Sequence, residues 1–134
     1  MKSDYAARAV LGLAQHYQSG EALKVEDLAR AYSLPKTYLV QILIELKARH
    51  IVQSVRGKEG GYLLARAPSA ISLGEVLRCI HGEVFDTPAL TDPACPPELR
   101  SAWRTIQRAL DQAADQITFQ QLLEESAERK MFYI

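Results

Sequence analysis

The chain has 134 residues, 48% of them hydrophobic, which is enough for one compact core with a short appendage. No run of about 18 apolar residues and no apolar leader are present, so we expect a cytoplasmic protein without a membrane span or secretory signal. The net charge is zero, but residues 1–66 carry ten Lys and Arg against six Asp and Glu, and residues 67–134 carry six against ten. This asymmetry favours a basic, anion-binding module joined to a segment that faces elsewhere.

The first third of the chain has the apolar spacing of three short helices. Apolar side chains recur every three or four positions over residues 5–18, with Ser3 or Asp4 as the expected N-cap. Glu26 and Asp27 place negative charge in the first turn of a second helix, and Pro35 is expected to open a third. In the third helix one face should be buried and the other exposed. The buried stripe is predicted to be Leu39, Ile42, Leu43 and Leu46, and the outward face Thr37, Gln41 and Ile44, flanked by Lys36, Tyr38 and Val40.

A basic hairpin follows the third helix. Residues 51–56 and 62–65 read as two strands, and the turn between them contains three glycines. Its tip carries Arg56, Gly57 and Lys58. A helix followed by such a hairpin is typical of a winged helix-turn-helix, in which the helix enters a DNA major groove and the hairpin reaches the minor groove. The predicted fold is therefore mainly α with a small β-hairpin, and residues 1–66 form the expected DNA-binding domain.

Residues 67–134 are predicted to hold dimerisation and regulatory helices. Ser72 and Glu75 form a capping box that opens one helix, and Thr118 with Gln121 opens the last. Residues 82–97 contain four of the six prolines and should form a loop. Between this loop and the last helix, apolar residues alternate at spacings of four and three, which predicts a long dimerisation helix. A helix packed within its own chain is the alternative. The spaced residues are Leu99, Trp103, Ile106, Leu110, Ala113 and Ile117.

The chemistry-bearing residues favour DNA contact over catalysis. The chain has no glycine-rich phosphate loop, nucleophile elbow or metal-spaced His/Glu pair, so we do not expect an enzyme. Thr37 and Gln41 lie one turn apart, and a glutamine can pair bidentately with adenine. Lys36 and Tyr38 suit phosphates, and Arg56 suits a narrow A·T-rich minor groove. A winged helix that binds only another protein is the alternative.

Four segments resemble one family. Residues 4–9, 38–41, 55–64 and 71–76 are similar to the Rrf-two (Rrf2) family of bacterial winged-helix regulators, and closest in type to its cysteine-metabolism repressors. The resemblance implies a homodimer, paired through a helix matching residues 98–116, that binds a partly palindromic operator. Val40 departs from the pattern, because several cluster-binding relatives carry glutamate there. The implied contacts are Gln41 with bases, Arg56 with the minor groove, and Lys2, Tyr5 and Arg8 with the DNA backbone.

The number and positions of the cysteines indicate whether such a regulator senses its signal through an iron–sulfur cluster. Iron–sulfur members of the family carry three cysteines in the loop before the dimerisation helix, whereas this loop holds only Cys95, and Cys79 lies in the preceding helix. Iron–sulfur clusters are normally held by three or four thiolates, so we expect no cofactor and no metal site. A redox-sensing or iron–sulfur regulator of the same family is the alternative, with Cys95 as the candidate thiol.

The C-terminal residues 131–134, Met-Phe-Tyr-Ile, resemble the ending of the cysteine-metabolism repressors. They are also similar to the terminal isoleucine that serine acetyltransferases insert into O-acetylserine sulfhydrylase. An apolar side chain next to a terminal carboxylate can be captured by backbone amides. The resemblance thus suggests O-acetylserine sulfhydrylase as a partner, bound through Tyr133 and Ile134. The alternative is a tail that packs on the partner chain's dimerisation helix.

Overall fold

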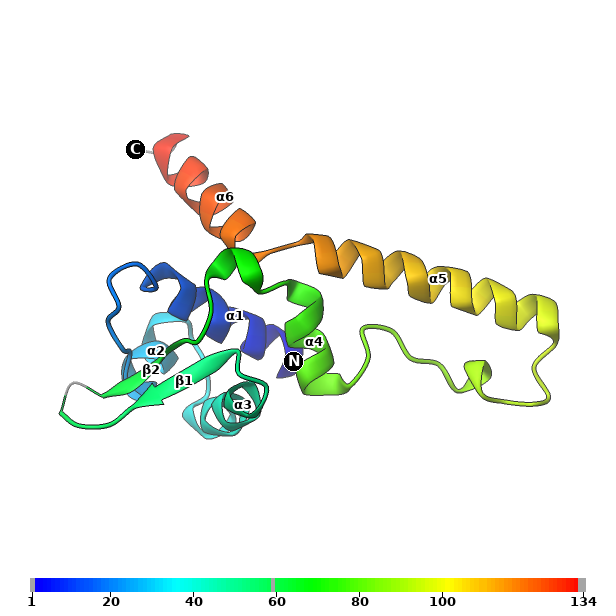
Figure 1. Cartoon of the computed structure of the whole chain (residues 1–134), viewed down its shortest axis with the longest axis horizontal. Coiled ribbons are helices and arrows are strands. Elements are labelled where there is room, and N and C mark those ends of the chain that lie inside the picture. Colours follow the sequence, from blue (N-terminus) through cyan, green and yellow to red (C-terminus); the bar gives the residue numbers. More distant parts are fainter. Residues whose placement is uncertain (1, 59, 133–134) are drawn as a thin grey trace.

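The computed structural model describes residues 2–58 and 60–132, and within these ranges the fold is mainly helical with one antiparallel hairpin. The helix-turn-helix, the wing and α4 form a compact body, from which α5 extends as a long arm (Figure 1). The elements in chain order are α1 (Lys2–Gln15), α2 (Val25–Ala31), α3 (Lys36–Ala48), β1 (Val52–Val55), β2 (Gly61–Leu64), η1 (Pro68–Ala70), α4 (Leu73–His81), η2 (Pro88–Leu90), α5 (Pro97–Gln116) and α6 (Phe119–Phe132).

Element boundaries differ from the predicted ones by a few residues. Helix α1 begins at Lys2, so Ser3 and Asp4 lie in its first turn, and their expected role as N-cap is wrong. Pro35 is the N-cap of α3, and its fixed φ suits that position. The first strand is shorter than the predicted 51–56, and the second is shifted by one residue from 62–65, because the ladder pairs only Val52 with Leu64 through Val55 with Gly61.

Helices α2 and α3 both end in a left-handed residue that is not glycine. Ser33 has φ 55° and His50 has φ 59°. After each, the next amide donates back into the helix: Leu34 to the Ala29 carbonyl at 2.8 Å, and Ile51 to the Leu46 carbonyl at 3.0 Å. These bonds are the six-to-one bonds of Schellman motifs. They turn the chain sharply, and so place α3 against α2 and β1 against α3.

The hairpin is fastened to the α1–α2 connection. Leu23 and Tyr62 exchange backbone hydrogen bonds, each 2.8 Å long, and so form an isolated antiparallel bridge between the α1–α2 connection and the wing. Gly61 makes this close approach possible, because a Cβ at that position would lie 2.2 Å from the Leu23 carbonyl oxygen. The wing is therefore tied to the body near the turn end of its ladder, and the tip projects beyond this attachment.

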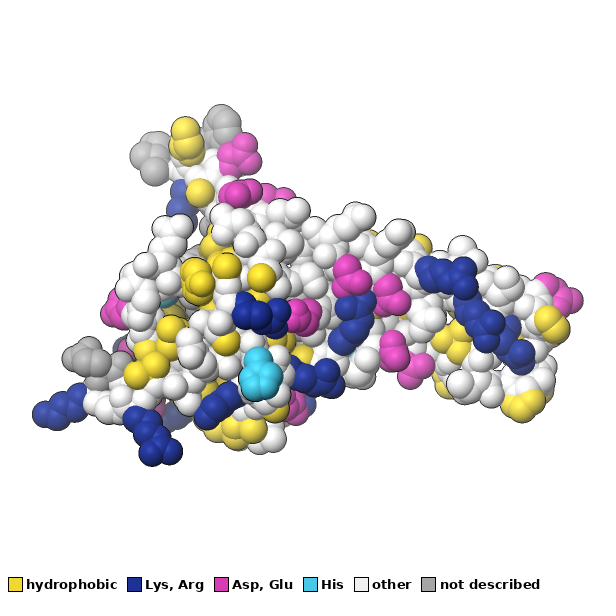
Figure 2. Space-filling model, viewed as in Figure 1, with side chains coloured by type: hydrophobic (Ala, Val, Ile, Leu, Met, Phe, Trp, Pro, Cys, Tyr) yellow, Lys and Arg dark blue, Asp and Glu magenta, His cyan; other side chains and the backbone are white. Residues whose placement is uncertain are grey.

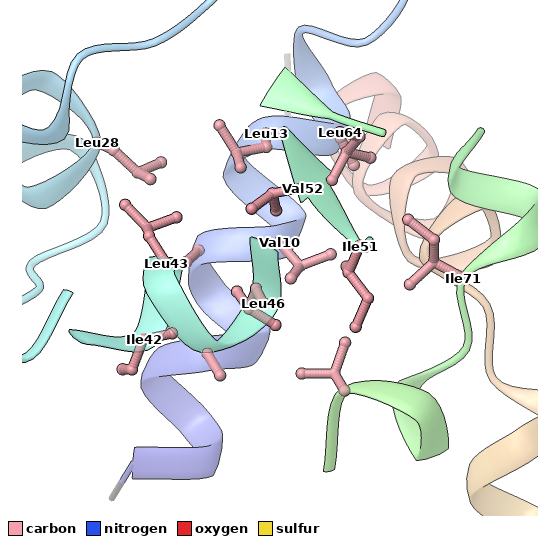
Figure 3. Packing of buried hydrophobic residues seen from close by; sticks show 14 of the residues in the cluster. Val10, Leu13, Leu28, Ile42, Leu43, Leu46, Ile51, Val52, Leu64 and Ile71 are labelled. Atoms are coloured by element: carbon pink, nitrogen blue, oxygen red, sulfur yellow. The ribbon is translucent and has the colours of Figure 1, made fainter. Parts of the chain in front are cut away.

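One apolar core runs through the body and contains residues from both sides of the predicted domain boundary at residue 66. Figure 3 shows Val10 and Leu13 of α1 facing Ile42, Leu43 and Leu46 of α3. The same cluster contains Ile71, Val76 and Phe119 from the second half of the chain. The division at residues 66 and 67 stays a prediction about function, since the packing is continuous across it.

Two helix starts have the caps that the sequence indicates. The Glu75 amide donates to the Ser72 hydroxyl at 3.1 Å, but the Glu75 carboxylate pairs with Arg66 instead of returning to the Ser72 amide. At α6 the box is reciprocal, because the Gln121 amide donates to Thr118 Oγ1 and the Thr118 amide to Gln121 Oε1, at 3.2 and 3.4 Å. The expected loop spans residues 82–96, interrupted by the short helix η2, and Pro97 is already the first residue of α5. Across the described ranges, no helix combines the length and apolar character that crossing a membrane requires.

Candidate nucleic-acid interface

Helix α3 divides into the two faces that its sequence predicts. Its buried residues are Leu39, Ile42, Leu43 and Leu46, all of which pack in the core. Thr37 and Gln41 are exposed on the other side, together with Tyr38, which is 60% exposed, and Ile44, which is 52% exposed. Exposed tyrosine and isoleucine side chains on a helix with a fully packed inner face are typical of a surface that meets a partner.

The start of α1 lies beside the start of α3. The rings of Tyr5 and Tyr38 have centroids 6.3 Å apart, and the Arg8 guanidinium lies 5.7 Å from the centre of the Tyr5 ring. Lys2 reaches Glu45 of α3, with Nζ 3.0 Å from Oε1. The structure therefore places Tyr5, with Arg8 on its ring, beside the first turn of α3, and Lys2 beside Glu45 in the C-terminal half of the same helix.

Three cations of this surface are already paired with carboxylates. Lys2 pairs with Glu45, Arg8 with Asp4 at 2.7 Å, and Lys36 with Glu26 of α2, with Nζ 2.9 Å from Oε1. The hydrogen bond and charge of Lys36 lower the pKa of the Glu26 carboxyl. Sequence reasoning missed these partners; only the four-residue spacing of Asp4 and Arg8 signals its pair. All three pairs are solvent-accessible, so a phosphate can compete for the cations.

The wing presents its basic tip away from the body. Arg56, Gly57 and Lys58 are exposed, and Gly57 has φ 106°, a conformation that other residues rarely adopt. Lys and Arg side chains project from this end of the molecule (Figure 2). The two parts of the candidate interface are thus the outward face of α3 with the start of α1, and the wing tip.

The predicted seam on α5 stays open to solvent. Leu99, Ile106 and Leu110 are 47%, 43% and 41% exposed, and Ala113 is exposed as well. Trp103 is partly covered by Phe85 of the preceding loop, whose ring is stacked on it with centroids 6.4 Å apart. Among the described residues of α5 only Ala114 is buried. Packing within the chain therefore leaves this seam uncovered, and its role in dimerisation stays a prediction.

The two cysteines lie in different surroundings. The Cys79 thiol donates to the Glu45 carbonyl at 3.4 Å, and burial raises its pKa. Cys95 is buried, and the Arg100 guanidinium binds the carbonyl oxygens of Asp92 and Cys95 at 2.7 and 3.1 Å. Arg100 thus ties Asp92 and Cys95, in the loop before α5, to the first turn of that helix. The two tail residues, Tyr133 and Ile134, lie outside the described residues.

Comparisons with known proteins agree on one family. Residues 1–125 match the Rrf2 family, described as an iron-dependent transcriptional regulator. The chain is 38% identical over 122 residues to an HTH-type transcriptional regulator of Mycobacterium tuberculosis strain H37Rv, covering 87% of this chain and 75% of that protein. It is 29% identical to CymR of Bacillus subtilis, over 99% of this chain and 96% of CymR.

Solved structures extend the likeness to the fold. The structure of IscR from T. potens matches with a TM-score of 0.81 and 28% identity, covering 99% of this chain and 94% of that one. The structure of CymR, the global cysteine regulator of B. subtilis, also gives a TM-score of 0.81, with 27% identity and coverage of 93% and 95%. These likenesses confirm the predicted fold class.

The family description names iron, which needs a set of ligating side chains. Within residues 2–58 and 60–132, no group of three or more His, Cys, Asp or Glu side chains is arranged to hold a metal ion. Cys79 and Cys95 lie in separate surroundings: the Cys79 thiol contacts α3, and Cys95 is in the loop before α5, with its thiol against the Pro96 carbonyl. The described residues of this chain therefore do not fit an iron site with thiolate ligands.

Proposed function

Because the chain belongs to the Rrf2 family of DNA-binding transcriptional regulators, we propose that it is a homodimeric repressor of a partly palindromic operator in the bacterial cytoplasm. One observation carries this proposal: the exposed turn of α3 with Thr37 and Gln41, beside the Tyr5–Tyr38 pair. A recognition helix reads base edges with residues near its N-terminus. The surrounding cations and tyrosines supply phosphate contacts that fix its register on the duplex.

The wing supports a second contact on the same DNA. Arg56 and Lys58 stand at the tip of a hairpin that is fastened to the body by the backbone bonds between Leu23 and Tyr62. An arginine held in this way suits a narrow A·T-rich minor groove, where the negative potential is strongest. The operator half-site should therefore combine a major-groove element read by Gln41 with an A·T-rich flank.

The open seam of α5 supports the homodimer. Three apolar side chains more than 40% exposed along one stripe are costly for a lone helix and suit a knobs-into-holes partner. A second copy provides the same stripe, and a two-fold axis through paired α5 helices would present two recognition helices to a palindromic site.

Sulfur metabolism is the proposed target of control. CymR, similar to this chain over nearly its whole length, is named as a global cysteine regulator. The apolar C-terminal tail supports the partner suggested by the sequence, O-acetylserine sulfhydrylase. In this proposal the enzyme binds the tail and reports cysteine supply to the regulator.

Selection of genomic fragments by the purified dimer, read by sequencing, tests the DNA-binding proposal. The wild type should enrich one palindromic A·T-rich site, and Arg56→Ala should lose it. Arg104→Ala, which removes an exposed arginine from α5, is the matched control and should behave as the wild type. If no site is enriched by any of the three proteins, the winged helix is a protein-interaction module instead.

Binding of O-acetylserine sulfhydrylase is measured separately, with the full chain and with a variant lacking Ile134. Loss of binding in the shortened chain supports the partner. Equal binding by both chains, or no binding by the full chain, refutes the proposed partner and leaves the DNA-binding proposal unaffected.

A further inference from the structure

The long arm α5 is joined to the body at one end only. Its single buried residue among those described is Ala114, near the C-terminal end, and the loop that precedes it runs along the arm rather than along the body. Any control over the direction of α5 relative to α3 must therefore act where α4 meets the last two turns of α5.

Helix α4 is itself fixed to the recognition helix. Val76 is fully buried in the core shared with α1 and α3, and the Cys79 thiol donates to the Glu45 carbonyl of α3. Contacts between α4 and α5 are thus contacts between a body that carries α3 and an arm that carries the seam.

Backbone hydrogen bonds hold the C-terminal end of α5 at this junction. The Leu73 amide donates to the Ile117 carbonyl at 2.7 Å, and the Phe119 amide donates to the Ile71 carbonyl at 3.1 Å. Gly74 lies directly against α5, because a Cβ there would be 2.2 Å from Asp115 Oδ1. These contacts fix the position of the arm's end and leave its tilt to be set further along the helix.

Arg78 of α4 makes the contacts that set the tilt. Its Nη1 lies 2.7 Å from Asp115 Oδ1, and its Nη2 lies 3.0 Å from Asp115 Oδ2 and 3.2 Å from Asp111 Oδ1. Two parallel bonds to one carboxylate fix the orientation of the guanidinium plane, and the third reaches one turn further along α5. Figure 2 shows basic and acidic side chains alternating where the arm leaves the body.

We propose that Arg78 is a positioning residue that sets the angle between the arm and the recognition helix, and thereby selects the half-site spacing that the dimer accepts. The inference rests on the proposed function, a dimer paired through α5 that binds two half-sites. A helix of 20 residues is about 30 Å long, so a tilt of about 10° displaces its far end by about 5 Å. This displacement exceeds the rise of one base pair, about 3.4 Å.

The experiment measures affinity for a set of operators that share both half-sites and differ in their separation by one to three base pairs either way. The wild type should prefer one separation at least tenfold over its neighbours. Arg78→Gln should reduce this preference at least threefold while the dimer is retained in sedimentation. Arg104→Gln, which removes an exposed arginine from α5, should keep the wild-type profile.

A second variant removes the carboxylates of α5 that Arg78 contacts. Asp111→Asn with Asp115→Asn should flatten the spacing profile in the same way, and combination with Arg78→Gln should add little, because all three residues form one contact. If the wild type has a sharp spacing profile and both variants keep it, the role of Arg78 is refuted, and the proposed function as a DNA-binding regulator is unaffected. If the wild type binds no operator of any spacing, the proposed function fails, and this inference fails with it.

Discussion

Charged side chains at the candidate interface are held in pairs before any DNA arrives. Lys36 with Glu26, Lys2 with Glu45 and Arg8 with Asp4 keep three long side chains in defined positions. Each carboxylate also neutralises part of the positive charge that its lysine or arginine would otherwise present to a DNA phosphate. The local charge of the surface is therefore smaller than its count of lysines and arginines indicates.

Glu26→Gln should strengthen DNA binding. The change releases Lys36 and adds one positive charge, so log K plotted against log salt concentration should become steeper by up to about one. Fluorescence anisotropy with a labelled duplex over a range of potassium chloride concentrations measures this slope. Asp27→Asn, which frees the neighbouring Arg30 on the same helix, is the control for net charge alone. Equal slopes for the two variants would contradict a specific role of Lys36.

His50 has a left-handed backbone conformation, and this conformation allows the turn from α3 into the wing. Its φ of 59° is costly for any residue with a Cβ, and the contact that depends on the turn is the backbone bond from Ile51 to Leu46. We expect His50→Gly to raise the free energy of unfolding by about 0.5–1 kcal/mol, measured by urea denaturation, because the relief of about 1–2 kcal/mol of left-handed strain exceeds the extra backbone entropy that glycine loses on folding. His50→Ala keeps the Cβ and should have no such effect; a similar gain there would assign the change to the imidazole instead.

At the scale of elements, α6 is anchored by its first residue. Phe119 is fully buried in the common core, and its amide donates to the Ile71 carbonyl, whereas Met131 near the other end is 80% exposed. Phe119→Ala should therefore destabilise the protein by about 3–5 kcal/mol, as expected for a large cavity in a packed core. Met131→Ala should change the unfolding free energy by less than about 0.5 kcal/mol. A small effect of Phe119→Ala in thermal or urea unfolding would mean that α6 docks independently of the core.

Prediction from sequence succeeded where local pattern decides the outcome. The period of α3 separates Leu39 and Leu43 from Thr37 and Gln41, because one face of a helix must be buried against the core. It failed for contacts between distant segments. Nothing near Lys2 in the sequence points to Glu45, which is 43 positions away, or shows that Phe119 enters the core beside Ile71. Such pairings depend on how the elements cross, and helix periodicity carries no information about this crossing.

At the scale of the whole molecule, the body and the arm divide two tasks. The body holds α3 and the wing in one rigid unit, whose core includes residues from both halves of the sequence. The arm carries an apolar seam that this unit does not cover. One protomer should bind a half-site only weakly, and high affinity should come from joining two protomers, since a linked second contact typically adds about two to four orders of magnitude.

Ile106→Glu tests this division. A carboxylate in the middle of the seam would be buried without a partner when two α5 helices pair, so we expect the variant to sediment as a monomer. Its fold should persist, because Ile106 is exposed in the single chain and contributes nothing to the core. Affinity for a palindromic operator should fall at least about 100-fold, while affinity for an isolated half-site should stay the same. Arg104→Glu, a charge change on the same helix outside the seam, should leave the dimer intact. A dimeric Ile106→Glu variant with full operator affinity would show that another surface joins the two protomers.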